Sequence, residues 1–403
     1  MSRAVAPQVL DPPDKRVAVA VLGSLQILSW GSTFYLLAVL AGPISRDTGW
    51  AYDQILGGLS IGLLVAGLVS PRVGRAIGLR GGRPVLALGA AILALGLVLI
   101  GSAQSIAWYF VGWAVLGMGM GAGLYDAAFA TLGGIYGKDA RTAITGVTLF
   151  GGFASTVCWP LSAFLLQHLN WRAACFVYAG IYLFVAVPLY LLTLPRHAAA
   201  ASAEAGPAAL APDATKRSDR LIFVVLAAVL TISAAILAMM GSHLVILLQA
   251  RGLDLGTAVA LGMLIGPSAV GARFVEMLAG KRYHPIWTMI ASVSLVAAGA
   301  CLFLSDTSLF AIAIILYASG NGIGSIAKGT LPLALFGPAR YPAVAGSLGL
   351  PIMFAMALAP YVGAVAFQHG GPRWTFLILV ALALSNVALV GLLLSVSSRR
   401  QHV

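Results

Sequence analysis

Two stretches of this chain decide its fold, because both are apolar, rich in glycine and similar to each other. Residues 113–132 read WAVLGMGMGAGLYDAAFATL, and residues 316–335 read LYASGNGIGSIAKGTLPLAL. Their glycines correspond at an offset of 203 residues, with Gly117, Gly119 and Gly121 recurring as Gly320, Gly322 and Gly324. Small residues at this spacing let membrane helices approach closely, whereas a nucleotide-binding loop would follow a strand. We therefore expect both stretches to be helices that pack tightly.

The composition around these stretches predicts a membrane protein. The chain has 403 residues, of which 60% are hydrophobic and 9% are charged, whereas a soluble domain carries about 25% charged residues. Continuous apolar runs of about 20 residues cross a bilayer as helices, while a barrel would show short alternating segments. The sequence therefore predicts an all-α membrane fold of twelve transmembrane helices. The expected spans are 17–41, 52–74, 84–102, 106–131, 142–166, 173–194, 221–248, 256–278, 286–304, 308–335, 342–367 and 374–396.

The chain is organised as two related halves. Two further landmarks recur at offsets of 201 and 197 residues, namely Gln167-His168 with Gln368-His369 and Val73-Gly74 with Val270-Gly271. We expect pseudo-symmetric six-helix bundles over residues 1–195 and 221–403, joined by a polar cytoplasmic linker over 196–220 that is rich in Ala and Pro. Internal repeats of this kind mark secondary transporters, whose site lies between the halves.

The basic residues predict the topology. Of the 24 lysines and arginines, nineteen fall on one side of the expected spans and four on the other, so both termini should face the cytoplasm of a bacterial inner membrane. The net charge of +12 then reflects topology and contact with anionic lipid, and not nucleic-acid binding. The first apolar run is too long for a signal peptide, so we expect it to be retained as the first membrane-spanning helix of a multi-pass protein.

The loop after the second expected span resembles a family signature. Residues 74–86 read GRAIGLRGGRPVL, similar to the G-x-L-A-D-R-x-G-R-R-x-x-L loop of the major facilitator superfamily. The matching positions are Gly74, Gly81, Arg83 and Leu86. Gly78 stands in place of the acidic residue, and Leu79 in place of the first basic one. The resemblance implies alternating access at a single central site, lined by the first, fourth, seventh and tenth helices.

Within that family, the fourth span looks most like that of the monocarboxylate and oxalate/formate branch. The residues that carry this resemblance are Trp113, the glycine run and YDAAF at 125–129. A proton-antiporting drug exporter would carry an arginine near Trp113 and a different Gly-Pro pattern in the fifth span. The resemblance implies transport of a small organic anion, a carboxylate, by proton symport or anion exchange. The alternative is efflux of a neutral or cationic drug or metabolite by proton antiport.

Four charged residues lie inside expected spans, where an ionised group costs roughly 2.5–3.5 kcal/mol unless it is paired or hydrated. They are Asp126, Arg273, Glu276 and Lys328. Asp126 and Lys328 follow corresponding glycines at matching depth, so we expect a pair across the halves that closes the cytoplasmic side. Arg273 should hold the anion, as the resemblance implies. Glu276 is the i,i+3 neighbour of Arg273, so a local ion pair between them is an equal possibility. The net charge of Asp126, Arg273 and Lys328 is +1, and it becomes zero when Glu276 is counted.

Other candidate site residues carry weaker signals. Trp30, Tyr35 and Tyr125 suit an amphipathic ligand, although core packing explains them equally well. His243 could couple protons together with Asp126, or could be a hydrogen-bonded interior residue.

The sequence contains no catalytic or metal-binding motif and no P-loop, so we expect no enzyme activity, no metal, no cofactor and no ATP-driven pump. The expected partners are a small-molecule substrate, protons or a counter-transported anion, and membrane lipid, with the chain acting as a monomer. A membrane sensor or scaffold subunit is the competing class.

Overall fold

A computed structural model describes residues 14–195, 217–304 and 309–401. These residues are helical almost throughout, and this part of the chain contains no strand, so the predicted all-α fold is confirmed. Most of the expected linker lies outside the described residues. Helix α11 begins at Arg217, so the last four residues of the expected linker are helical.

The first half of the chain forms long helices, several of which are interrupted near their middle. In chain order the elements are α1 (Lys15–Gly31), α2 (Leu37–Thr48), α3 (Tyr52–Arg80), α4 (Gly82–Gly101), α5 (Ile106–Gly123), α6 (Tyr125–Tyr136), the short η1 (Gly137–Asp139), α7 (Ala140–Gly151), α8 (Ala154–His168), α9 (Trp171–Ile181), the π-helical η2 (Tyr182–Ala186) and α10 (Val187–Thr193).

The second half follows a similar plan. Its elements are α11 (Arg217–Gln249), α12 (Leu255–Gly262), α13 (Ile265–Ala279), the short η4 (Gly280–Arg282), α14 (Pro285–Leu302) and α15 (Phe310–Gln401). The last element joins several helices across two sharp kinks, at Gly337 and Gly371, where φ is +76° and +67°. Glycine adopts this left-handed backbone without a steric penalty, so these two residues turn the chain between successive spans.

Eight helices in the described part are long and apolar enough to cross a membrane. Two of them, Ile106–His168 and Phe310–Ser398, are 63 and 89 residues long and contain several expected spans each. This organisation is consistent with the twelve spans expected. Many helices run past the expected ends, for example α3 to Arg80, because a helix can continue into water beyond the hydrocarbon.

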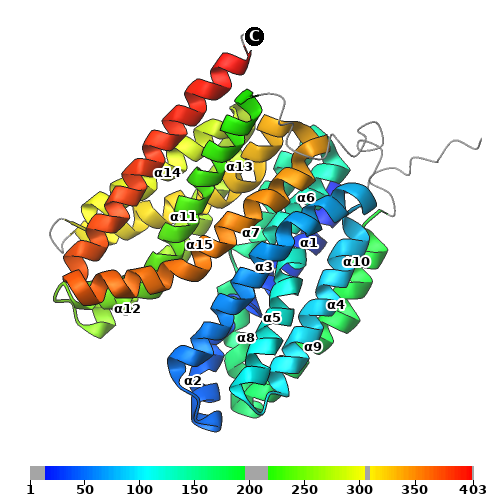
Figure 1. Cartoon of the computed structure of the whole chain (residues 1–403), viewed down its shortest axis with the longest axis vertical. Helices are drawn as coiled ribbons and strands as arrows, with labels where there is room; N and C mark the ends of the chain where they lie inside the picture. Colours follow the sequence, from blue (N-terminus) through cyan, green and yellow to red (C-terminus); the bar gives the residue numbers. More distant parts are fainter. Residues whose placement is uncertain (1–13, 196–216, 305–308, 402–403) are drawn as a thin grey trace, which may run out of the picture.

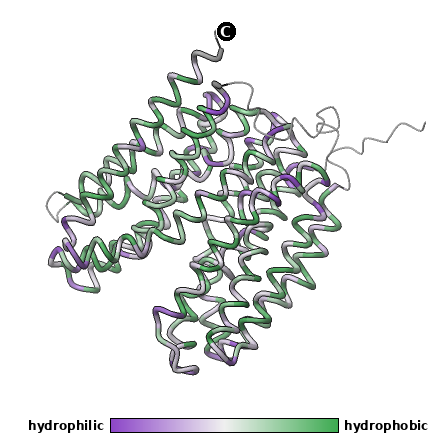
Figure 2. Tube along the Cα trace, viewed as in Figure 1, coloured by the Kyte–Doolittle hydropathy of each residue, from purple (hydrophilic) through white to green (hydrophobic). Residues whose placement is uncertain are grey.

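The outer surface is apolar, as a lipid-facing surface must be. Phe184 and Leu192 are each 81% exposed, and many other large apolar side chains are exposed along the helices. Figure 2 shows hydrophobic residues along the lengths of the helices and hydrophilic residues gathered mainly near their ends. Exposure of so much apolar surface would be unfavourable in water, whereas it is favourable in contact with lipid.

The two halves meet at one end of the molecule, which we call the basic end because Lys15, Arg80, Arg141 and Arg340 lie there. In Figure 1 the halves approach each other near α6 and α13 and diverge toward α2 and α12. At the basic end α3 lies directly against α15, and a β-carbon added to Gly74 would lie 2.9 Å from Cα of Gly346. Glycine at both positions therefore permits the two halves to touch backbone to backbone.

Candidate functional site

Several helices break at places that face the junction of the halves. The first expected span is interrupted between α1 and α2, the fourth at Leu124, the fifth at Gly152–Phe153, and the eighth between α12 and α13. Interrupted helices expose backbone donors and acceptors inside the membrane, which is tolerated where they line a cavity or a site. The sequence contains glycines at or beside each break, and we had expected the run at 117–123 to serve packing.

That packing role is confirmed. A β-carbon on Gly119 would lie 2.7 Å from the backbone of Leu93 in α4, and one on Gly117 would lie even closer to the Gly62 carbonyl oxygen in α3. The break after Gly123 adds a second consequence. The side chain of Gln26, fully buried in α1, donates to the Gly123 carbonyl over 2.7 Å and satisfies the acceptor that the break leaves without a helical partner.

Asp126 and Lys328 form an ion pair between the halves. Nζ of Lys328 lies 2.8 Å from Oδ1 and 3.1 Å from Oδ2 of Asp126, and the two side chains are 19% and 11% exposed. Asp126 stands in the first turn of α6, directly after the break at Leu124, where the positive end of the helix dipole favours a carboxylate. The break and the start of α6 therefore hold the Asp126 carboxylate in the position where it pairs with Lys328.

Arg273 extends from α13 into the junction of the halves without an acidic partner. Its Nε donates to the Gly322 carbonyl and to the Ser325 hydroxyl, each over 3.1 Å. Its guanidinium also lies against Gly152, at the break in the fifth span. The described residues contain four ion pairs, and Arg273 belongs to none of them.

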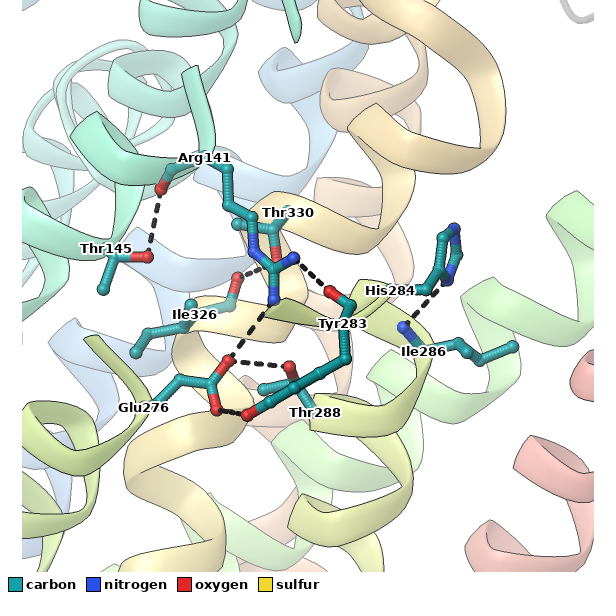
Figure 3. Close-up of polar contacts among 9 residues, drawn as sticks. All are labelled: Arg141, Thr145, Glu276, Tyr283, His284, Ile286, Thr288, Ile326 and Thr330. Atoms are coloured by element: carbon teal, nitrogen blue, oxygen red, sulfur yellow. Dashed lines mark hydrogen bonds and ion pairs between the residues drawn. The ribbon is translucent and has the colours of Figure 1, made fainter. Parts of the chain in front are cut away.

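Of the two possibilities for Glu276, the local pair with Arg273 is not the one that forms. Glu276 is 6% exposed and pairs with Arg141 of α7, with 3.5 Å between Oε1 and Nη2. The hydroxyl of Thr288 donates to Oε1 over 2.7 Å, and that of Tyr283 donates to Oε2. Figure 3 shows these side chains converging on the carboxylate. On one helix the two neighbours point to different elements, Arg273 toward α15 and Glu276 toward α7 and α14.

Arg141 is the residue of this cluster that sequence reasoning missed, because it was counted only as a topology charge. Besides its pair with Glu276 it donates to the Tyr283 carbonyl over 2.5 Å, and its guanidinium lies 5.7 Å from the centre of that tyrosine ring. Arg141 therefore connects the first half to both α13 and the start of α14. The cluster is a second polar link between the halves at the basic end (Figure 3).

Two groups at the margin of this cluster have altered acidity. Burial and the hydrogen bond to Glu276 raise the pKa of Tyr283. Burial and the nearby charge of Arg141 lower the pKa of His284 below its usual value of 6.5. Nδ1 of His284 accepts from the Ile286 N–H over 3.2 Å and so caps α14 in its neutral form.

The aromatic candidates form a continuous row beside Arg273. Measured between ring centres, Trp30 lies 5.1 Å from Tyr125 and 5.7 Å from Phe34. Phe34 lies 5.2 Å from Tyr35, which lies 6.1 Å from Trp159. Tyr35 and Tyr125 both lie within electrostatic range of Arg273. The Nε1 donor of Trp30 is buried and has no hydrogen-bond partner among the described residues. The row therefore presents a spare donor close to a cation.

Asn321 is a further site residue that sequence reasoning did not find. Its Nδ2 is buried, and its side chain interacts with Tyr317 one turn earlier in α15. Asn321, Ser325 and Lys328 are spaced i, i+4 and i+7, so they share one face of α15. Ser325 and Lys328 contact Arg273 and Asp126, so that face looks into the junction. Because Asn321 lies seven residues before Lys328 on the same helix face, helical spacing could have identified it as a site residue once Lys328 was a candidate.

The remaining candidates lie elsewhere. His243 is buried in α11, where Nδ1 is 2.7 Å from the Ser242 hydroxyl and 3.2 Å from the Met239 carbonyl, and it packs against Gly363. In the signature loop, Gly74 contacts α15, and Gly81 ends α3 with a φ of +78° that suits glycine. Arg83 is half-buried at the start of α4.

Comparison with known proteins gives a family match. Residues 22–285 match the family described as Major Facilitator Superfamily. The multidrug resistance protein MdtL of Escherichia coli is 26% identical over 355 residues, which cover 84% of each chain. An uncharacterized 38 kDa protein of Thermoproteus tenax is 29% identical over 88% of this chain and 90% of its own. The efflux pump mlcE of Penicillium citrinum is 32% identical over 144 residues, only 26% of that pump.

Solved structures show the same fold at low sequence identity. The human organic anion transporter MFSD10 superposes with a TM-score of 0.70 at 16% identity. The superposition covers 94% of this chain and 100% of that transporter. The transporter FucP in its outward conformation superposes with a TM-score of 0.71 at 14% identity, covering 93% and 98%.

Proposed function

Because the chain belongs to the Major Facilitator Superfamily, a family of membrane transporters, we propose that it moves a small organic anion, a carboxylate, across the membrane by alternating access. The energy comes from proton symport or from anion exchange. The proposal places the site between two six-helix bundles, 1–195 and 221–403, in a chain that acts as a monomer in a bacterial inner membrane with both termini in the cytoplasm.

The observation that carries this proposal is the uncompensated charge of Arg273. Asp126 and Lys328 neutralise each other, and Glu276 is engaged by Arg141, so neither carboxylate offsets the guanidinium. An anion would restore the balance, since a buried unpaired charge is costly. The spare donor of Trp30 favours a ligand rich in acceptors, such as a carboxylate.

The Asp126–Lys328 pair supports a gate at the basic end. Opposite charges about 4 Å apart attract by about 4 kcal/mol at a surface-like effective dielectric, which can bias two states yet be overcome by a ligand or a proton. A substrate carboxylate could compete for Lys328, and protonation of Asp126 would also release it. With the basic end in the cytoplasm, this arrangement is the outward-facing state.

One experiment tests the anion proposal directly. The purified chain is heated with carboxylates, with the matching neutral amides, and with organic ammonium ions. A ligand that binds only the folded state raises its melting temperature. Stabilisation by carboxylates that is lost in Arg273→Leu would support the proposal, whereas stabilisation by cations alone would overturn it.

Drug efflux is the second candidate, and a specific observation favours it. Two relatives carry the names multidrug resistance protein and efflux pump, and the aromatic row would also suit a lipophilic cation. Reconstituted vesicles separate the classes: proton-driven export of cationic dyes without carboxylate transport supports efflux. A chain that transports nothing from a broad metabolite panel would instead be a sensor or scaffold.

A further inference from the structure

A groove lies between α2 and α8, beside the proposed site. Its volume is about 450 Å³, within the range of roughly 300–1,000 Å³ typical of small-molecule pockets. Its lining is apolar except for two hydroxyl groups and contains no charged side chain. The lining residues are Ala38, Val39, Ser155, Thr156, Trp159, Pro160 and Ala163.

One wall of the groove begins at Arg273. Thr156, Trp159 and Ala163 are spaced i, i+3 and i+7, so they follow one face of α8, and Gly152 lies at the break just before that helix begins. Gly152 contacts the guanidinium of Arg273, and the other three residues line the groove. At 1.5 Å per residue the helical wall from Thr156 to Ala163 is about 10 Å long.

The opposite wall begins beside Tyr35. Ala38 and Val39 lie in the first turn of α2, and the N–H of Ala38 donates to the Tyr35 carbonyl over 3.3 Å. Tyr35 and Trp159 join the two walls through an edge-to-face contact at 87°. Trp159 is nonetheless 44% exposed, so its ring has apolar surface left for a ligand.

We propose that this groove receives the apolar tail of the substrate while Arg273 holds its anionic head. The inference rests on the proposed function and adds the shape of the substrate: an elongated, amphipathic carboxylate with an unbranched or aromatic tail. The tail lies along Trp159 and Ala163, where no charged group needs to be desolvated. A short, fully polar carboxylate such as oxalate leaves this surface uncovered and binds more weakly.

The experiment measures binding of straight-chain carboxylates from acetate to octanoate to the purified full chain, by thermal stabilisation. Each methylene that enters the groove should tighten binding two- to fourfold, since burial of a methylene contributes about 0.8 kcal/mol. Phenylalkanoates should follow the same trend.

Groove-filling variants locate the effect. Ala163→Phe and Val39→Phe obstruct the two walls separately, so one remains informative if the other fails to fold. Each should weaken octanoate about tenfold more than acetate. Val157→Phe, on the exposed face of the same helix, is the matched control and should leave the dependence on chain length unchanged.

The outcomes separate this inference from the function on which it rests. Carboxylate binding that depends on Arg273 but not on tail length, or that is unaffected by both groove variants, overturns the inference alone. A dependence on tail length that is equal for carboxylates, amides and alkylammonium ions supports the groove and overturns the anion function. Absence of binding by the whole series overturns both.

Discussion

Nζ of Lys328 lies 2.8 Å from Oδ1 of Asp126, although 202 residues separate them in the chain. The contact joins α15 to the broken fourth span, and it lies on the side of the molecule where the halves touch. Any motion that separates the halves at the basic end must break this pair, so its replacement should report on the conformational equilibrium.

Neutralising Asp126 alone should harm the protein more than neutralising both partners. Asp126→Asn leaves a half-buried lysine without its carboxylate, and loss of one partner of a buried pair costs about 3 kcal/mol. Thermal unfolding of the two single variants and the double variant with Lys328→Met measures the coupling. The charge swap Asp126→Lys with Lys328→Asp should restore closure in spin-label distances. Strictly additive effects with unchanged closure would exclude a gate.

Arg273 should determine anion affinity more than stability. Arg273→Leu removes the charge and should weaken carboxylate binding about tenfold to a hundredfold, since a hydrogen bond to a charged group contributes about 1.5–3 kcal/mol. Arg273→Lys keeps the charge but cannot repeat both the Gly322 and Ser325 contacts. An intermediate affinity is therefore expected for lysine. Equal affinities in all three proteins, measured by ligand-induced stabilisation, would place the anion elsewhere.

Acidification should loosen the start of α14. The pKa of His284 is lowered in the folded protein, so the native state resists protonation and loses stability as pH falls below about 6.5. Protonated Nδ1 can no longer accept from Ile286, which removes the helix cap. Melting temperatures between pH 8 and 5 should fall less in His284→Asn, since asparagine caps without titrating. Parallel curves for the two proteins would contradict this assignment.

Gly74 should tolerate no side chain while the basic end is closed. A β-carbon there would lie 2.9 Å from Cα of Gly346, whereas one on Gly57 of the same helix has nothing within 4 Å. Gly74→Ala should destabilise the closed arrangement by about 1–3 kcal/mol through overpacking, and Gly57→Ala should stabilise α3 slightly through helix propensity. Cross-linking between introduced cysteines at the basic end measures closure, and equal yields in both variants would refute the contact.

Composition and apolar runs were sufficient to predict the membrane character and the all-α fold, because lipid permits few alternatives. The helix breaks were not predicted, since glycines at 117–123 suit both close packing and interruption. Helical spacing suggested an Arg273–Glu276 pair and missed Arg141, because it describes neighbours on one helix and says nothing of the helices opposite. Asn321 was missed because an uncharged amide inside a span gives no distinctive signal by itself.

The glycine contact between α3 and α15 also bears on how fast the basic end can open. Interlocked side chains must leave their pockets together, and the activation barrier then includes the simultaneous loss of many dispersion contacts. Gly74 and Gly346 present smooth backbone surfaces to each other, but beside them the Tyr341 ring packs against Gly133, and Phe129 packs against Gly329. Opening of this interface should therefore require these two aromatic side chains to leave their glycine contacts in the same step that breaks the ion pairs, while the glycine contact itself adds little to the barrier.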